Sequence, residues 1–267
     1  MRRFSPLAQR RIRAFAANRR ALTALVVFVA VFVLTLFAEL IANDRPLLLK
    51  YNGKLYFPVL AEYTEQEFGG DFPTPADYRD EFVRQNIEKS GWMIMPPVPF
   101  SFNTVDYDLT TPTPAPPSSR HWLGTDDEGR DILARILYGI RLSVVFAFLL
   151  TMVSSLIGIS AGAVQGYFGG RVDIFMQRFM EIWESLPQLF ILIIVASIFV
   201  PTFWSLLIIL MFFSWTSLTG MVRAEFLRAR NLEYVKAAKA LGVGNGRIIF
   251  RHILPNAVVT TLSLIHI

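Results

Sequence analysis

The residues of this chain that could catalyse a reaction or bind a metal are few and widely separated. The sequence contains no cysteine, which excludes disulfides, thiolate ligands and a cysteine nucleophile. The three histidines, His121, His252 and His266, match no metal-ligand spacing. No lysine follows a Gly-x-x-x-x-Gly pattern, so the chain lacks a phosphate-binding P-loop. We therefore predict no enzyme activity and no metal, catalytic group or cofactor belonging to this chain.

Two groups of acidic residues remain as candidates for chemistry. The run 126–128 stands beside Arg130 and Arg135, just before a long apolar run, where ion pairing and helix capping explain it better than catalysis. Glu181 and Glu184 precede another apolar run. They are predicted either to line a translocation path or to reach water at the membrane interface.

The composition indicates which elements must position these residues. With 53% hydrophobic and 18% charged residues, the chain is too apolar for an ordinary soluble protein. Residues 21–42 are long enough to cross a membrane as one helix. A cleaved signal peptide is the alternative, but no small-x-small site follows. Residues 1–20 carry seven arginines and no acid, which predicts a cytoplasmic N-terminus. Since the arginines flank apolar runs, the net charge of +5 indicates membrane orientation and not nucleic-acid binding.

Residues 43–135 are predicted to form a periplasmic insertion and linker. Acidic residues outnumber basic ones there, and the proline-rich part from Pro96 to Pro117 disfavours regular helix or central strand. Alternating apolar residues at 47–56, with Asn52-Gly53 between them, predict a short hairpin.

Residues 136–267 are predicted to form a membrane core. Its uncharged runs give spans at about 142–164, 185–200 and 203–222, and a partial span from 255. Counting spans from a cytoplasmic N-terminus places the basic loop 223–255 in the cytoplasm. Because the last run stops at residue 267, we expect a C-terminally truncated chain whose residues 262–267 are not native.

Three glycines recur every four residues in the second apolar run, at Gly158, Gly162 and Gly166. Small residues at this spacing allow another helix to approach closely in lipid, where packing drives association. The alternative is that small residues stand there by chance.

The basic loop is predicted to form a helix, a bend and a second helix. Residues 231–241 have Leu232, Val235, Ala238 and Leu241 at three-residue spacing, Gly242 ends the helix, and residues 247–254 form a second amphipathic piece. Such a shape suits insertion into a groove on a soluble partner, or a position at the lipid surface.

The run Ala-Ala-Lys-Ala-Leu-Gly at 237–242, followed after nine residues by His-Ile-Leu-Pro at 252–255, closely resembles the EAA loop of ABC importer permeases. Lys236 stands where the family's glutamate would be, so no ionic role is inferred there. The resemblance implies that this loop is the coupling helix bound by the ATPase subunit. The implied interface residues are Tyr234, Val235, Ala237, Ala238, Ala240, Leu241, Gly242, His252 and Pro255.

Two further motifs resemble the dipeptide and oligopeptide permease family. One is the run 123–135, with Gly124, Thr125, Asp126, Gly129, Arg130 and Asp131, and the other is Gly-Tyr-Phe-Gly-Gly-Arg-Val-Asp at 166–173. Together with the loop above, the matches cover roughly 123–255, half of the chain. The runs 39–48, 56–60 and 68–70 look like the enlarged periplasmic segment of the microcin C type.

The resemblance implies an all-α integral membrane protein, a polytopic helix bundle of the type I ABC importer permease kind. Its implied role is a permease subunit for oligopeptides or peptide-like compounds in a bacterial inner membrane. The implied partners are ABC ATPase subunits, which bind ATP and Mg, a second permease subunit forming a heterodimer, a periplasmic substrate-binding protein and membrane lipid. The alternative is a membrane-anchored structural or sensory protein that recruits a soluble partner through its cytoplasmic loop.

Overall fold

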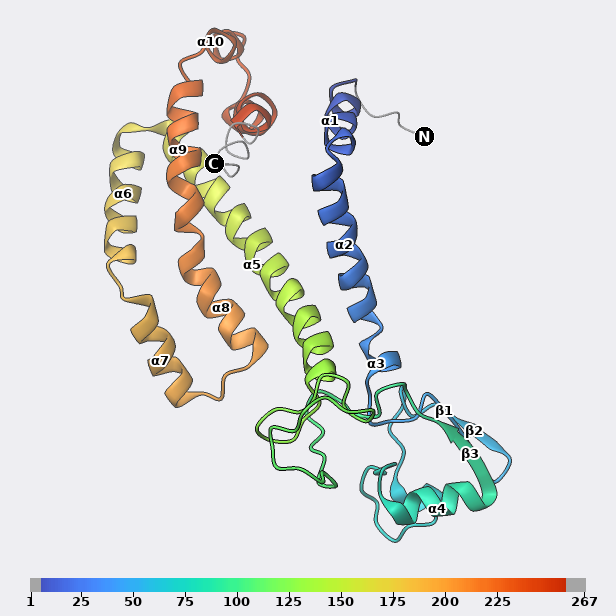
Figure 1. Cartoon of the computed structure of the whole chain (residues 1–267). Coiled ribbons are helices and arrows are strands. Elements are labelled where there is room, and N and C mark those ends of the chain that lie inside the picture. The colour runs from blue at the N-terminus through green and yellow to red at the C-terminus, as the bar shows by residue number, and fades with distance from the viewer. Residues whose placement is uncertain (1–5, 258–267) are drawn as a thin grey trace. The chain divides into compact units, whose positions relative to one another are not determined.

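The computed structural model describes residues 6–257 of the chain as a mainly helical protein (Figure 1). The chain divides into two compact units, residues 1–144 and 145–267, which are described separately. Helix is the main secondary structure of the described chain, in agreement with the predicted fold class, and the strands all lie in unit 1.

Unit 1 begins with α1 (Pro6–Ala17), α2 (Arg19–Leu36) and the short α3 (Ala38–Ile41). The Asn18 side chain accepts a hydrogen bond from the Ala21 backbone N–H, which caps the start of α2. Most apolar side chains of α2 are exposed, as expected for a helix whose surroundings are lipid.

A small sheet follows, formed by β1 (Leu48–Tyr51), β2 (Lys54–Tyr56) and β3 (Gly91–Ile94). The strands run antiparallel in the order β2-β1-β3. Asn52 and Gly53 take positive φ angles of 48° and 79°, as the two central residues of a tight hairpin turn require. The predicted hairpin at 47–56 is therefore confirmed.

The insertion has its own hydrophobic core, which the sequence did not predict. The 3-10 helix η1 (Glu65–Phe68) and the helix α4 (Glu81–Ser90) pack with the sheet around Leu49, Phe68, Tyr78, Val83 and Ile87. Asp80 accepts hydrogen bonds from the N–H groups of Phe82 and Val83 and caps α4. Part of the insertion is thus a folded module rather than a linker.

The helix α5 (Ile132–Phe168) starts in unit 1 and continues into unit 2. In unit 1 its first turns pack with α3 around a second core of Ala38, Ala42, Val98, Phe100, Ala134 and Leu137. Arg141 forms an ion pair with Glu39 at 2.7 Å, and the Tyr138 hydroxyl donates to the Ala42 carbonyl.

Unit 2 contains the rest of α5 and the helices α6 (Gly170–Glu184), α7 (Gln188–Ile198), α8 (Phe203–Ser214) and α9 (Thr216–Ala229). The cytoplasmic loop of the prediction contains α10 (Glu233–Ala240), α11 (Asn245–Arg247) and the π-helical η2 (Ile248–Ile253).

Within residues 6–257, three helical stretches are long and apolar enough to cross a membrane: Arg19–Leu36, Ile132–Phe168 and Phe203–Ala229. The predicted span 142–164 falls inside α5, and the span 203–222 falls inside α8 and α9. The predicted span 185–200 differs, because α7 has only 11 residues, too few to cross alone. It is joined to α6 by a 59° bend, and the pair could form a fourth span. Most of the predicted partial span from 255 lies outside the described residues.

Candidate functional site

The segment 231–257 forms the bent pair of helices that its sequence predicts. After α10, Gly242 takes a φ of 73°, the Gly242 N–H donates to the Lys239 carbonyl, and the Val243 N–H donates to the Ala238 carbonyl. This pattern of a left-handed residue and two returning hydrogen bonds is the Schellman termination of a helix. It turns the chain toward α11 and η2.

The two sides of α10 have different surroundings. Val235 (0% exposed) and Ala238 (7%) are buried in the core of unit 2, beside Val222, Phe226 and Ile248. Since their surfaces are already covered by this chain, a partner subunit would meet the other residues of the predicted ATPase interface.

The other predicted interface residues keep accessible surface. Leu241 is 83% exposed and Tyr234 39% exposed. Also exposed are Ala237, Ala240, Gly242 and Pro255, while His252 is half-buried. We call the exposed set Tyr234, Ala237, Ala240, Leu241 and Gly242 the cytoplasmic apolar patch, after the side of the membrane that the sequence predicts for it. Glu233 and Lys236 form an exposed ion pair at 2.9 Å beside it.

The three glycines of α5 lie against α9. A Cβ added to Gly158, Gly162 or Gly166 would stand 2.5, 2.6 or 2.5 Å from the backbone oxygens of Trp215, Thr219 and Arg223, in that order. Real Cβ atoms do not approach an oxygen so closely, so any side chain there would push the helices apart. The contact therefore depends on glycine at all three positions.

An ion pair joins α6 to α9 close to this contact. Arg223 Nε lies 2.5 Å from Asp173 Oδ1, and Arg223 Nη2 lies 2.7 Å from Asp173 Oδ2. Two parallel hydrogen bonds of this kind fix the guanidinium in one orientation. Asp173 ends the motif 166–173, so the motif is attached to α9 at both ends, by Gly166 and by Asp173.

The motif 123–135 builds the start of α5. Asp126 forms ion pairs with Arg130 and Arg135, and Glu128 pairs with Arg130, which confirms the predicted local pairing for these two acids. Asp131 Oδ1 accepts a hydrogen bond of 2.8 Å from the Ala134 N–H, which caps the helix.

The remaining members of this motif shape the loop before the helix. Gly124 and Gly129 both have a φ of 80°, a backbone conformation that is strained for residues with a side chain. Thr125 exchanges hydrogen bonds with the backbone of Ala115, one through its N–H and one through its hydroxyl. The motif thereby holds the proline-rich segment against the start of α5.

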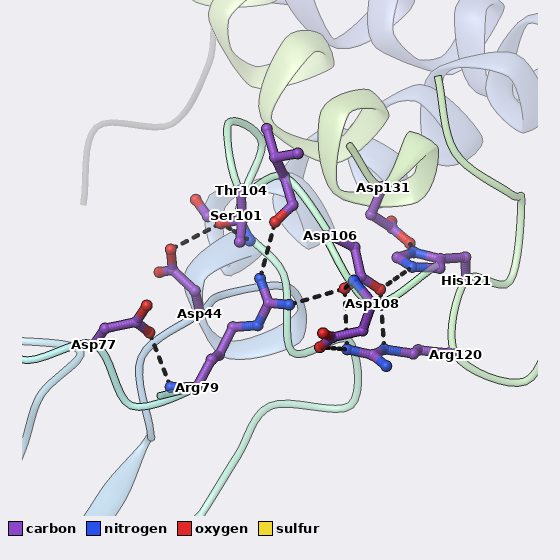
Figure 2. Close-up of polar contacts among 11 residues, drawn as sticks. Asp44, Asp77, Arg79, Ser101, Thr104, Asp106, Asp108, Arg120, His121 and Asp131 are labelled. Atoms are coloured by element: carbon purple, nitrogen blue, oxygen red, sulfur yellow. Dashed lines mark hydrogen bonds and ion pairs between the residues drawn. The ribbon is translucent and has the colours of Figure 1, made fainter. Parts of the chain in front are cut away.

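A buried polar network that the sequence did not predict lies beside this motif (Figure 2). His121 Nδ1 lies 2.8 Å from Asp131 Oδ2, and His121 Nε2 lies 3.0 Å from Asp106 Oδ2. All three side chains are buried. Arg79 and Arg120 each lie 3.1 Å from Asp106 and face the ring of Phe100, at 4.7 and 5.5 Å from its centroid.

The electrostatics of this network centre on Asp106. Burial by itself would raise the pKa of its carboxyl group. Hydrogen bonds from His121 and from the Asp108 backbone, together with the charges of Arg120 and Arg79, outweigh burial and hold the pKa of Asp106 below its ordinary value. Its side-chain partners come from two parts of the insertion, Arg79 from one and the adjacent Arg120 and His121 from the other, so the network ties α5 to the periplasmic module of the prediction. In the part of the chain that the structure describes, no group of three or more acidic, histidine or cysteine residues suits a metal ion.

Comparison with known proteins shows which family the chain belongs to. Residues 154–267 match the family described as "Binding-protein-dependent transport system inner membrane component". The chain is 49% identical over 265 residues to the "Inner membrane ABC transporter permease protein YejE" of Escherichia coli K12, an alignment that covers 99% of this chain and 78% of that protein. The chain therefore belongs to the peptide and dipeptide permease family of ABC transporters, whose members are multi-pass inner-membrane subunits.

Two further relatives bear on the substrate. The chain is 46% identical to the "Peptidoglycan transport system permease protein YejE" of Agrobacterium fabrum, over 98% of this chain and 75% of that protein. It is 36% identical to the "Dipeptide transport system permease protein DppC" of Bacillus subtilis, over 56% of this chain and 48% of that protein.

Proposed function

We propose that this chain is the permease subunit of an importer that carries oligopeptides or peptide-like compounds across the inner membrane. ATP and Mg are bound by separate ATPase subunits, and the loop 223–255 carries their movement to the membrane helices. The family and the two-sided α10 support this proposal. The rival function is an anchor that only recruits a soluble partner. The several apolar helices of the described residues and the match to a permease family do not favour it.

One observation carries the coupling proposal. The cytoplasmic apolar patch leaves Leu241 83% exposed beside the bend at Gly242, while Val235 and Ala238 on the same helix are locked into the core. A helix anchored on one side and apolar on the other can transmit a push from a partner to the bundle. The force passes through packing, so no single salt bridge is required.

The substrate is proposed as a class. The names of the relatives include dipeptide, oligopeptide and peptidoglycan transport, and all three kinds of substrate contain peptide bonds. Within this class we propose the microcin C type, on the resemblance of the insertion. We expect an external binding protein to supply most of the selectivity.

The proposed orientation places the N-terminus in the cytoplasm and the insertion in the periplasm. The arginines at the start of α2, including Arg19 and Arg20, support it. A second permease subunit and lipid would cover the exposed apolar side chains of α7, such as Leu189 (73% exposed) and Ile193 (62%).

The test is transport by the reconstituted, full-length system. The protein would be placed in proteoliposomes with its partner permease, ATPases and binding protein, and uptake of a radiolabelled oligopeptide and of a radiolabelled muropeptide measured with and without ATP. ATP-dependent accumulation of either supports the proposal. Accumulation of neither would contradict it, and microcin C uptake by the same vesicles decides the subtype.

A further inference from the structure

Tyr167 lies at the C-terminal end of α5, within the motif 166–173, and the proposed function gives it no role. Its side chain is buried (4% exposed) in the core that also holds Val235, Ala238 and Ile248. Its hydroxyl donates a hydrogen bond of 2.7 Å to Asn245 Oδ1, across 78 residues of sequence. The bond reaches the first residue of α11.

The same ring touches the other half of the bent segment. Lys239 Nζ, in the last turn of α10, lies 4.8 Å from the centroid of the Tyr167 ring, within the range of a cation–π contact. Lys239 precedes the bend at Gly242 and Asn245 follows it. Tyr167 therefore contacts both helices of the coupling segment from a single position on α5.

These contacts differ from those that fix the rest of the motif. Gly166 and Asp173 bind α9, and α9 is already joined to α10 by the chain itself over residues 230–232. Covalent connection thus carries movement of the segment into α9 whatever Tyr167 does. Transfer of this movement to α5 depends on non-covalent contacts. Among the side-chain hydrogen bonds described for residues 6–257, the bond from Tyr167 to Asn245 is the one that joins α5 to the segment 231–257.

We propose that Tyr167 is a positioning residue for transport: its hydroxyl and ring hold the bent coupling segment to α5, so that the segment and this helix move together. The inference rests on the proposed function, because it needs an ATPase that moves the segment. It assigns a role to a motif residue that otherwise only fills the core.

The experiment compares uptake per ATP hydrolysed in proteoliposomes containing the complete transporter. Tyr167→Phe keeps the ring and removes the hydroxyl, and Asn245→Ala removes the acceptor. We expect ATP hydrolysis within about twofold of wild type and uptake per ATP lowered roughly fivefold in each variant, the ratio that loss of one hydrogen bond produces. The double variant should show little further loss, since both changes break the same bond.

Two variants serve as controls. Asn245→Asp keeps an acceptor oxygen and should retain coupling, and Tyr107→Phe removes a hydroxyl from an 89% exposed tyrosine of the insertion and should change nothing. A purely structural role for Tyr167 would lower thermal stability, hydrolysis and uptake together, at an unchanged ratio.

An unchanged ratio of uptake to hydrolysis in Tyr167→Phe and Asn245→Ala would overturn the inference. Failure of the proposed function looks different, since the wild-type system would then show no ATP-dependent uptake at all.

Discussion

His121 and Asp131 meet through a 2.8 Å contact between Nδ1 and Oδ2, with the imidazole side chain 2% exposed and the carboxylate fully buried. The other ring nitrogen faces Asp106 at 3.0 Å. Both contacts are hydrogen bonds at once when the imidazole carries a proton on each nitrogen. The His121 ring thereby joins Asp131, which caps α5, to Asp106, which forms ion pairs with Arg79 and Arg120.

Removing the charge of Asp106 should open this part of the insertion. Asp106→Asn leaves Arg79, Arg120 and His121 without their shared carboxylate. Removing one partner from a buried group of paired charges lowers the stability of the fold by about 3 kcal/mol. We expect proteolysis of the insertion in the purified protein to become roughly 100-fold faster or more.

The matched control is Asp108→Asn, whose carboxylate is 75% exposed and also pairs with Arg120. It should change the cleavage rate little, because exposed pairs contribute little. Equal rates in the two variants would show that the network does not stabilise the insertion.

Stability of the insertion should fall in acid through Asp106. Its pKa in the folded protein lies below the ordinary value of 3.8, so its contribution is fully present above that value and is lost as pH falls through the folded pKa. Wild-type protein should therefore lose protease resistance more steeply than Asp106→Asn below about pH 4. Parallel curves for the two proteins would contradict this assignment.

A side chain at Gly162 should separate α5 from α9. Gly162→Ala places a Cβ 2.6 Å from the backbone oxygen of Thr219. Overpacking of this kind lowers the free energy of unfolding by about 1–3 kcal/mol. Gly139→Ala, in the same helix, meets nothing within 4 Å and gains about 1 kcal/mol of helix propensity. Thermal unfolding in detergent should show a lower melting temperature for the first and an equal or higher one for the second. A drop in both would point to helix distortion rather than to the helix contact.

A charge on the cytoplasmic apolar patch should weaken binding of the ATPase subunits. Leu241→Glu buries an unpaired carboxylate if the patch is covered by a partner, and a change at the centre of an interface costs about 2 kcal/mol or more, roughly 30-fold in affinity. Leu60→Glu, at an 82% exposed position in the insertion, is the matched control. Co-purification of the ATPases with each variant is the measurement, and equal recovery would remove Leu241 from the interface.

The sequence predicted those features that depend on neighbouring residues. The hairpin follows from Asn52-Gly53, whose residues accept positive φ, and the bend of the segment 231–257 follows from Gly242. Features that depend on distant pairing were missed. Gly91 of β3 pairs with Tyr51 across 40 residues, and His121 meets carboxylates 10 and 15 residues away within irregular chain. Neither contact produces a periodic pattern.

The different burial of the apolar residues of α10 has a geometric reason. Residues three apart in a helix are rotated by about 60° from one another, so a run of four such positions turns through about 180°. The four positions therefore cannot share one face: Val235 and Ala238 lie in the core, while the flanking cap residues Leu232 and Leu241 are 43% and 83% exposed. The exposure of Leu241, beyond the last turn, could have been anticipated from the glycine that follows it.

The most direct test of the proposed function is the uptake of a radiolabelled oligopeptide or muropeptide by proteoliposomes that contain the complete transporter. We predict accumulation that requires ATP, the binding protein and this chain, and that falls when Leu241→Glu replaces the wild-type subunit. Accumulation of peptide without ATP, or none under any condition, would contradict it.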